Sequence, residues 1–577
     1  MKNLLLIIAT LLASQASQAN NELPLAELKK ILSEQEYMQY THELWQKDRK
    51  KAEVTDYSDQ LNNRQGGNTL TVGPNEQCAF PTIQLAINFA VPGDTIFVGS
   101  GIVGGTDAKL NIDKELTLVG GLDSTCQVFT ANRTFLQLDD TGPVITINVS
   151  GGKNVIISGF DISGSQPGNL LLTSGIFATG DGTVTVSNSH IHNNEALLGG
   201  GISAINGVTM NINENTEIYA NTANGQGGGV FCSESNLNII NTLIGKTGTD
   251  QGNSTPSETG EGGGIYSGNC TVAIGETNMG DGAVEINYNK SRYGAGIFTI
   301  DSNLDFGHIG SRISFNSSSS QVYGQGNAIY GQNVNNIVFE NLKITDNWFG
   351  ETIDISGTTD IIIRSTCGNS LCSEISRNRG PAIRALGNSS ALISSTQISA
   401  NLNSVISTNT LNVTGIKIIN SIISDNSTNQ SGIGIIGQTQ GPNMEFDNVT
   451  IANNTGYNSI FGSLLDAGGD NDFDGGIIWG NDVTGLTDNN FNGSVMISNS
   501  IIQFPPVGYP NTLQSDPLFK NPANGDYHIK FGSPAVDHFN SVLMVDFEGD
   551  SRPQGLLDDA GADEWTDLIF KNSFEQD

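Results

Sequence analysis

The residues whose spacing most clearly suggests chemistry are three aspartates in the last quarter of the chain. Asp470, Asp472 and Asp474 alternate with other residues and are followed by Gly475. Oxygen ligands at the first, third and fifth positions, with glycine at the sixth, match the first half of a calcium-binding loop. The twelfth position, where such loops carry a bidentate glutamate, is Asn481. We predict calcium at the three aspartates, with an acidic loop that holds no ion as the alternative.

Two further groups of side chains have metal-binding chemistry. Asp546, Glu548 and Asp550 alternate in the same way and form a second candidate for calcium. His190 and His192 are expected to flank a turn, without metal-ligand partners at the spacing of a zinc site. We therefore predict no metal at the two histidines.

A third group combines basic and acidic side chains. A polysaccharide lyase needs an arginine or lysine base beside calcium-binding carboxylates, and a glycosidase needs two separated carboxylates. The densest combination of this kind consists of Arg364, Arg377, Arg379, Arg384, Asp346, Asp354 and Asp360. A solvated turn explains the same residues more simply, so we assign no catalytic residue.

The elements that must position these residues follow from an internal repeat. Isoleucine is followed three residues later by asparagine at Ile191/Asn194, Ile218/Asn221, Ile286/Asn289, Ile313/Asn316, Ile344/Asn347, Ile375/Asn378, Ile398/Asn401, Ile423/Asn426, Ile451/Asn454 and Ile478/Asn481. Eight of the nine intervals between these isoleucines lie between 23 and 31 residues, and the ninth, of 68, is wide enough to hide a degenerate copy. A period of this size is typical of stacked repeats. Asparagine is abundant, so we expect two or three of these matches to arise by chance.

Each repeat has the composition of short strands. Segments 184–186, 361–363 and 416–419 are rich in β-branched residues and are bounded by turn residues. No helical period of useful length separates them, which excludes leucine-rich, ankyrin and tetratricopeptide arrays. Two or three short parallel strands per repeat, joined by tight turns, predict an all-β parallel β-helix over residues 69–514.

The recurring asparagine has a physical role in such a coil. A turn that repeats in register places equivalent amides about 4.8 Å apart. Asparagine tolerates left-handed backbone, and its amide both donates and accepts hydrogen bonds. We expect the amides to form a column on the outside of the coil and the isoleucines to stack inside it.

A glycine motif supports the same architecture. Small residues precede an aliphatic residue at 199–202, 227–230, 262–265, 294–297 and 326–329. Glycine lets the backbone turn a tight corner before the next strand. A phosphate-binding loop is disfavoured because neither a helix nor a lysine follows.

Over about Ser187 to Asn426, the paired glycine and asparagine motifs resemble the repeats of chlamydial polymorphic outer-membrane proteins and related bacterial right-handed β-helix proteins. The resemblance implies a right-handed solenoid that serves as a surface adhesin or a secreted factor. The C-terminal sequence differs from that family, which argues against autotransport.

The two ends of the repeat carry other resemblances. Residues 80–98, with an expected short helix that has Thr82 near its start, resemble the N-terminal cap of bacterial β-helix proteins, including pectate-lyase-like ones. Residues 515–566 contain in order Asp516-Pro517, Gly525-Asp526-Tyr527-His528, Arg552-Pro553 and Gly561-Ala562-Asp563-Glu564, and are similar to the "choice-of-anchor Q" C-terminal region of secreted bacterial proteins. Residues 567–577 form a short tail, which is either read by a sorting system or simply frayed.

The N-terminal sequence and the cysteines indicate export. Residues 1–19 read as a signal peptide, and residues 20–68 as a charged helical segment followed by a linker. No other apolar run approaches the length of a membrane span. Six cysteines in an exported chain predict disulfides, and pairing between neighbouring coils gives Cys78–Cys126, Cys232–Cys270 and Cys367–Cys372. We expect an extracellular or outer-surface protein of a Gram-negative bacterium.

Charge limits the partners. The chain has 26 basic and 59 acidic residues, a net charge of −33, which disfavours nucleic acid as a partner. We predict a non-catalytic, adhesin-like binding protein whose partner is a surface glycan or another cell-surface component. The alternative is a polysaccharide lyase or glycoside hydrolase that acts on an extended glycan.

Overall fold

The structure is a computed structural model. It describes residues 66–74, 77–168, 173–246, 251–275, 282–318, 324–366, 373–408, 413–428, 436–438, 444–456, 471–483, 495–505 and 508–565. The predicted signal peptide, almost all of segment 20–68, the tail 567–577, Asp470 and the pair Cys367 and Cys372 lie outside these residues.

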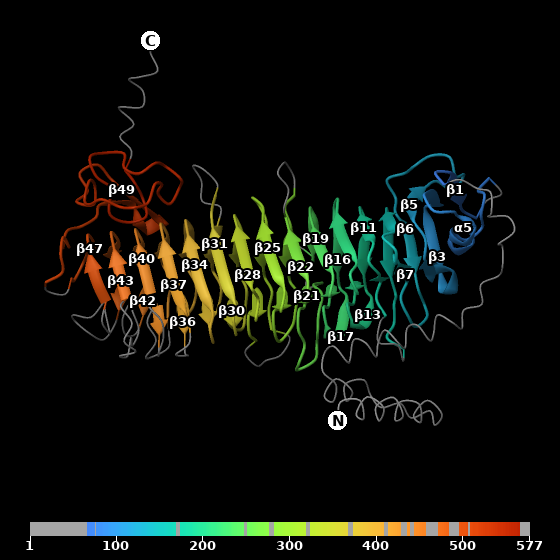
Figure 1. Cartoon of the computed structure of the whole chain (residues 1–577), viewed down its shortest axis with the longest axis horizontal. Coiled ribbons are helices and arrows are strands. Elements are labelled where there is room, and N and C mark those ends of the chain that lie inside the picture. Colours follow the sequence, from blue (N-terminus) through green and yellow to red (C-terminus); the bar gives the residue numbers. More distant parts are fainter. Residues whose placement is uncertain are drawn as a thin grey trace, which may run out of the picture.

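Three long parallel sheets form an elongated shaft (Figure 1). In the described chain, sheet A has 16 strands from β1 (Thr69–Val72) to β46 (Val495–Ser498). Sheet B has 15 strands from β3 (Gly101–Gly104) to β47 (Ile501–Ile502). Sheet C has 12 strands from β4 (Leu110–Ile112) to β39 (Ile436–Gln438). The fold is a right-handed type of parallel β-solenoid with about 13 turns, which confirms the predicted fold class.

One coil shows how the sequence builds the shaft. The chain passes through β10 (Ile176–Thr179) in sheet C, β11 (Thr183–Ser187) in sheet A and β12 (His190–His192) in sheet B. It then returns to sheet C at β14 (Ile202–Ile205), where Ile176 pairs with Ile202. Within β11 the two valines are buried and the two threonines that alternate with them are not, because neighbouring side chains on a strand point to opposite faces. Stacked aliphatic side chains therefore fill one continuous core along the shaft.

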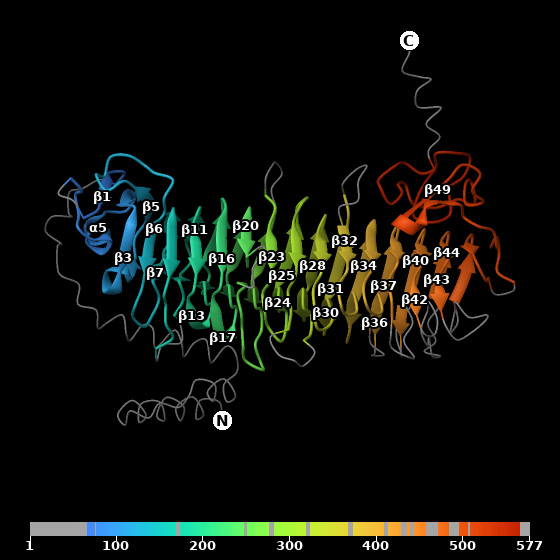
Figure 2. The ribbon, with the colours of Figure 1, turned by 180° about the vertical axis from the view of Figure 1, so that it is seen from behind.

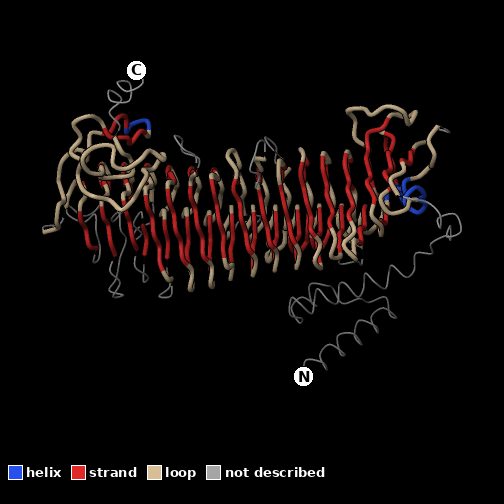
Figure 3. Tube along the Cα trace, turned by 45° about the horizontal axis from the view of Figure 1, so that its top comes forward, coloured by secondary structure: helices blue, strands red, loops and turns tan. Residues whose placement is uncertain are grey.

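A single short α-helix is present in the described residues, at the N-terminal end of the shaft; the blue segment at the opposite end in Figure 3 is a 3₁₀ turn at Pro522–Asn524. Helix α5 spans Ile83–Phe89, and Thr82 is its N-cap, accepting a hydrogen bond from the backbone N–H of Leu85. Ile83, Ala86 and Ile87 face the core. The predicted helix is therefore present, whereas its role as a cap stays a prediction.

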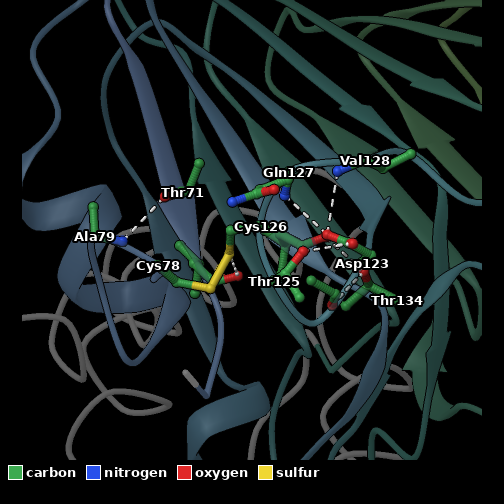
Figure 4. The surroundings of a disulfide bond; sticks show 12 residues. Thr71, Cys78, Ala79, Asp123, Thr125, Cys126, Gln127, Val128 and Thr134 are labelled. Atoms are coloured by element: carbon green, nitrogen blue, oxygen red, sulfur yellow. Dashed lines mark hydrogen bonds between the residues drawn. A yellow bond between two sulfur atoms is a disulfide. The ribbon is translucent and has the colours of Figure 1, made fainter. Parts of the chain in front are cut away.

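Two of the three predicted disulfides are present. Cys78 is bonded to Cys126 and Cys232 to Cys270. Figure 4 shows the first beside the turn that begins at Asp123, whose carboxylate accepts the N–H groups of Gln127 and Val128. The second joins neighbouring coils, since β18 (Val230–Ser233) pairs directly with β21 (Ile265–Gly268).

The C-terminal region lies against the side of the last coils, as both faces of the molecule show (Figures 1 and 2). It contains the small antiparallel pair β48 (Phe519–Asn521) and β49 (Asp526–Ile529). Its apolar residues, including Tyr527, pack on outward-facing side chains of sheet B, such as Ile477 and Ile501. The phenol of Tyr527 donates to the carboxylate of Asp425 at 2.9 Å, which joins this region to the shaft.

Candidate functional site

The repeated asparagines form one hydrogen-bonded ladder that sets the register of the turns. Each side-chain Nδ2 donates to the Oδ1 of the next asparagine at 2.9–3.1 Å, through Asn194, Asn221, Asn253, Asn289, Asn316, Asn347, Asn378, Asn401, Asn426, Asn454 and Asn481. All ten predicted pairs take part, so the expectation that two or three arise by chance is wrong. Asn253, which follows Ile244, supplies the copy hidden in the long interval.

Two details of the predicted column are also wrong. The first ten amides are buried, so the ladder lies inside the coil rather than on its outside. The left-handed residue is the one before the asparagine, as at Ala220, Tyr288 and Phe315. Burial explains the choice of side chain, because an amide can satisfy its own donor and acceptor along the stack without water.

The residue after each ladder asparagine occupies an equivalent position on every coil. The backbone N–H of Trp348, Arg379 and Leu402 donates to the carbonyl of Asn316, Asn347 and Asn378 respectively, at 2.8–3.0 Å. Trp348 is 38% exposed and Leu402 is 52% exposed, and Arg379 is exposed as well. At most other coils this position carries a small or polar residue, such as Thr222, Ser254, Ser317, Ser427 and Thr455. We call Trp348, Arg379 and Leu402, with the neighbouring Phe349, the Trp348 strip.

Contacts within the strip are suited to recognition. The Arg379 guanidinium lies over the Trp348 ring, 4.7 Å from its centroid, a cation–π arrangement. Phe349 is 56% exposed and has a φ of 69°, a left-handed backbone conformation. On the other coils the left-handed residue of the ladder turn is the one before the asparagine, so Phe349 is an additional left-handed residue. Bulky side chains rarely adopt this backbone conformation, and such strain is concentrated at functional sites.

A buried ionic group follows the strip along the chain. Arg384 contacts Asp354 through two nitrogens and Glu351 at 2.9 Å. Burial raises the pKa of Asp354 and of Glu351, and Arg384 opposes both shifts. Glu351 Oε2 is buried without a hydrogen-bond partner among the described residues. Asp354 is fully buried and held by the arginine, so it presents no free carboxylate to a substrate.

The predicted arginine–aspartate constellation is divided among several faces. Arg364 pairs with Glu340 on sheet A, and Arg377 pairs with Asp346 beside the ladder turn. Asp360 accepts a hydrogen bond from Ser390 on sheet A and is not part of the buried group. The constellation therefore does not converge on one reaction centre.

The buried group continues a row of aromatic rings on the outer face of sheet C. Phe231, Tyr266, Phe298 and Tyr330 stack at 5.0–5.4 Å, with their planes within 8° of parallel. The residues next in register are Asp354 and Arg384. Burial raises the pKa of Tyr330, the last ring of the row. The row forms a small hydrophobic cluster separate from the main core.

The two histidines both lie on strand β12, so they do not flank a turn, although the left-handed corner at Asn193 directly follows His192. His192 Nε2 is 2.7 Å from Asp161 Oδ1, and His190 Nδ1 is 3.5 Å from Asp161 Oδ2. Burial works against the charged carboxylate, but the two histidines outweigh it and hold the pKa of Asp161 well below its usual value. The His192 ring stacks on the Tyr219 ring, and Lys246 Nζ lies 3.9 Å from the centroid of the Tyr219 ring. Sequence spacing missed this cluster because Asp161 is one coil away.

The acidic groups proposed for calcium have the following geometry. Asp472 and Asp474 lie on strand β43 (Asn471–Asp474), beside Glu445 and Asp447 of the preceding strand. Burial and these neighbouring carboxylates raise the pKa of Asp472. Asp470 lies outside the described residues, so calcium at the three aspartates stays a prediction.

The second acidic group does not converge as an alternating set. Asp546 Oδ1 accepts the backbone N–H groups of Glu548 and Asp550 and so closes a turn. Glu548 instead points to His528, with 3.1 Å between His528 Nε2 and Glu548 Oε2.

Comparisons with known proteins give a fold likeness only. No family model matches the chain, and no curated protein matches it. Among solved structures, pectate lyase Pel9A is similar with 13% identity and a TM-score of 0.26, over 87% of this chain and 97% of that chain. A likeness at this level carries no argument about activity. The resemblances to outer-membrane protein repeats and to the choice-of-anchor region gain no support from these comparisons. None of the described helices is long and apolar enough to cross a membrane.

Proposed function

We propose that the protein is a non-catalytic, adhesin-like binding protein that holds an extended glycan along the Trp348 strip. The observation that carries the proposal is the exposed Trp348 ring with the Arg379 guanidinium lying over it, in a position that is small or polar on most other coils. An exposed aromatic face packs against a sugar ring, and an arginine donates to hydroxyl or carboxylate oxygens. Leu402 continues the surface on the next coil.

The shape of the shaft supports an extended ligand. Consecutive coils are about 4.8 Å apart, so the three positions of the strip span roughly 10 Å. That length accommodates about two sugar rings, and the neighbouring coils extend the same edge in both directions. The strip therefore suits a chain-like ligand better than a single small molecule.

The test is a glycan array, followed by titration calorimetry on the ligands found. We expect Trp348→Ala to weaken binding by about 2 kcal/mol, roughly 30-fold, which is the scale of a tryptophan at the centre of an interface. Arg379→Ala should also weaken binding. Phe504→Ala, which removes another exposed aromatic ring, is the matched control. Equal affinity in Trp348→Ala and Phe504→Ala would exclude the strip as the binding site.

A glycoside hydrolase is the second candidate, because Glu351 has a raised pKa and lies two residues after Phe349. A carboxyl group of this kind is suited to protonate a leaving oxygen. Its nearest acidic neighbour, Asp354, is buried and bound by Arg384, so the second carboxylate that hydrolysis needs is missing among the described residues. Glycan turnover that disappears in Glu351→Gln would establish this second function over the first.

Calcium binding and surface display complete the proposal. Asp472 and Asp474 share an acidic face with Glu445 and Asp447, and Lys417 pairs with Glu445 and Asp447. Calcium bound at Asp470, Asp472 and Asp474 would neutralise the remaining negative charge of this face. Display outside the cell agrees with the two disulfides. The measurement for calcium is a titration of wild type and Asp472→Asn, with binding expected only in wild type.

A further inference from the structure

We propose that the C-terminal region contains a divalent transition-metal site, made for an ion such as Zn²⁺, with His528, Glu548 and Asp563 as its protein ligands. One ligand atom from each residue lies within 4.8 Å of the other two. Zinc binds imidazole nitrogen and carboxylate oxygen at about 2.0–2.2 Å, so small side-chain rotations bring all three atoms to one ion. Three protein ligands leave the fourth tetrahedral position for water.

Three separate segments of backbone bring these ligands together. His528 lies on strand β49, and the backbone N–H of the next residue, Ile529, donates to Asp563 Oδ2 at 2.8 Å. The backbone N–H of Phe547 donates to the carbonyl of Ala562 at 2.9 Å, which places the following residues, Glu548 and Asp563, side by side. The Phe547–Ala562 contact does not depend on the ligand side chains, whereas the Ile529 contact is made to the Asp563 carboxylate itself and orients it.

The orientation of the imidazole is that of a metal ligand. His528 Nδ1 lies 2.5 Å from Asp526 Oδ1, and Nε2 faces Glu548. Metal-binding histidines usually donate their second ring N–H to a carboxylate, which fixes the tautomer and turns the free nitrogen toward the ion. Asp526 is therefore the positioning residue, and Nε2 is the ligand atom.

The charge around the site also calls for a cation. Asp563 is only 6% exposed, and no lysine or arginine within the described chain lies at ion-pair distance from it. Asp546 is buried nearby, whereas the one buried cation of the region, Arg552, pairs with Glu564 instead. Lys520, on the paired strand β48, is exposed and acts on Asp563 only as a nearby charge. Asp563 is stabilised by the Ile529 N–H and by the nearby His528, and a bound divalent ion would add further compensating charge to this buried carboxylate.

The site would stabilise the attachment of the C-terminal region. His528 is next to Tyr527, whose phenol contacts Asp425 of the shaft, and Asp563 is next to Ala562, whose N–H donates to Thr450. An ion that joins His528 to Asp563 therefore connects two of the segments that hold the region against the shaft. This role is independent of the Trp348 strip and of glycan binding.

The experiment is a titration of the metal-free, tag-free mature chain with Zn²⁺ at mildly alkaline pH, since the metal displaces a proton from the imidazole. Calorimetry should show one saturable high-affinity site, and Co²⁺ in its place should give the visible absorption of a tetrahedral site. His528→Gln and Glu548→Gln should each abolish that site. Asp526→Asn should weaken it by about 10–100-fold, the usual effect of losing a positioning carboxylate.

His538→Gln is the matched control, because His538 lies in the same region but its imidazole is hydrogen-bonded to the carbonyl of Asn511 and not to a carboxylate. Two results would overturn the proposal: wild type shows no high-affinity Zn²⁺ binding, or both His528→Gln and Glu548→Gln bind Zn²⁺ as tightly as wild type. In either case His528 is an ion-pair partner only. If His528→Gln does not fold, Glu548→Gln decides the matter, because its side chain is partly exposed at the rim of the site.

Discussion

Replacement of one ladder asparagine tests the physical basis of the whole shaft. Asn316 is fully buried in the middle of the ladder. Its Nδ2 donates to Asn347 Oδ1 at 3.1 Å and to the carbonyl of Ile286 at 2.9 Å. Its Oδ1 accepts the backbone N–H of Asn289 at 3.0 Å and the Nδ2 of Asn289 at 3.1 Å. Asn316→Ala therefore removes four hydrogen bonds and deprives a buried N–H of its acceptor.

The magnitude follows from these contacts. Each lost hydrogen bond costs about 1 kcal/mol net, and a buried donor without an acceptor costs about 1–3 kcal/mol. Because these terms overlap, we expect a loss of about 4 kcal/mol in the free energy of local opening. At about 1.4 kcal/mol per factor of ten, the N–H of Asn289 should exchange with solvent roughly a thousandfold faster.

The assay is native-state hydrogen exchange, because stability in a solenoid is a sum of local terms and global unfolding would average the effect. Asn316→Asp keeps the volume and the acceptor but removes the donor, so it separates hydrogen bonding from cavity formation. Asn303→Ala, at an exposed position on a strand of sheet A, is the control and should change exchange little. If Asn316→Ala and Asn303→Ala differ by less than about tenfold at Asn289, the ladder is not a source of stability.

Three further outcomes are expected. Tyr266→Ala, within the ring stack, should cost about 3–5 kcal/mol in chemical denaturation, whereas Tyr266→Phe should cost under about 1.5 kcal/mol because the stack is kept. Loss of the Cys232–Cys270 bond in a double alanine variant should cost about 2–4 kcal/mol, measured in the same way against the wild type with its disulfides intact. Folding lowers the carboxyl pKa of Asp161. The ionised carboxylate therefore stabilises the folded state at pH values above the unfolded-state pKa of about 4, and this stabilisation is lost as the pH falls below that pKa. The melting temperature of Asp161→Asn should therefore fall less steeply than that of wild type on acidification, and parallel curves would contradict this origin of the shift.

The sequence alone was enough to predict the coil but not the environment of its parts. The spacing of Ile191 and Asn194 and its copies gives the register directly, since equivalent residues must stack in a solenoid. The spacing could not show that the amides are buried, because an asparagine is compatible with either face of a turn. The hidden copy at Asn253 was missed because inserted residues separate it from Ile244.

The candidate site was only partly accessible from sequence. Arg379 and Arg384 stood out as rare cations, yet the sequence could not show that Arg384 is neutralised by Asp354 while Arg379 lies on Trp348. The strip could have been found by comparing the residue after each ladder asparagine. That comparison shows Trp348 among small and polar equivalents.

The sequence by itself determined a repeating β-solenoid, because a regular period of strand and turn residues has few other ways to bury its aliphatic side chains. Only the tertiary structure decided which side chains meet across coils. His192 meets Asp161 of the preceding coil, and His528 meets Glu548 and Asp563 through contacts between segments that lie outside the repeat. Such contacts depend on how backbone segments are stacked and folded back, and linear spacing does not record that geometry.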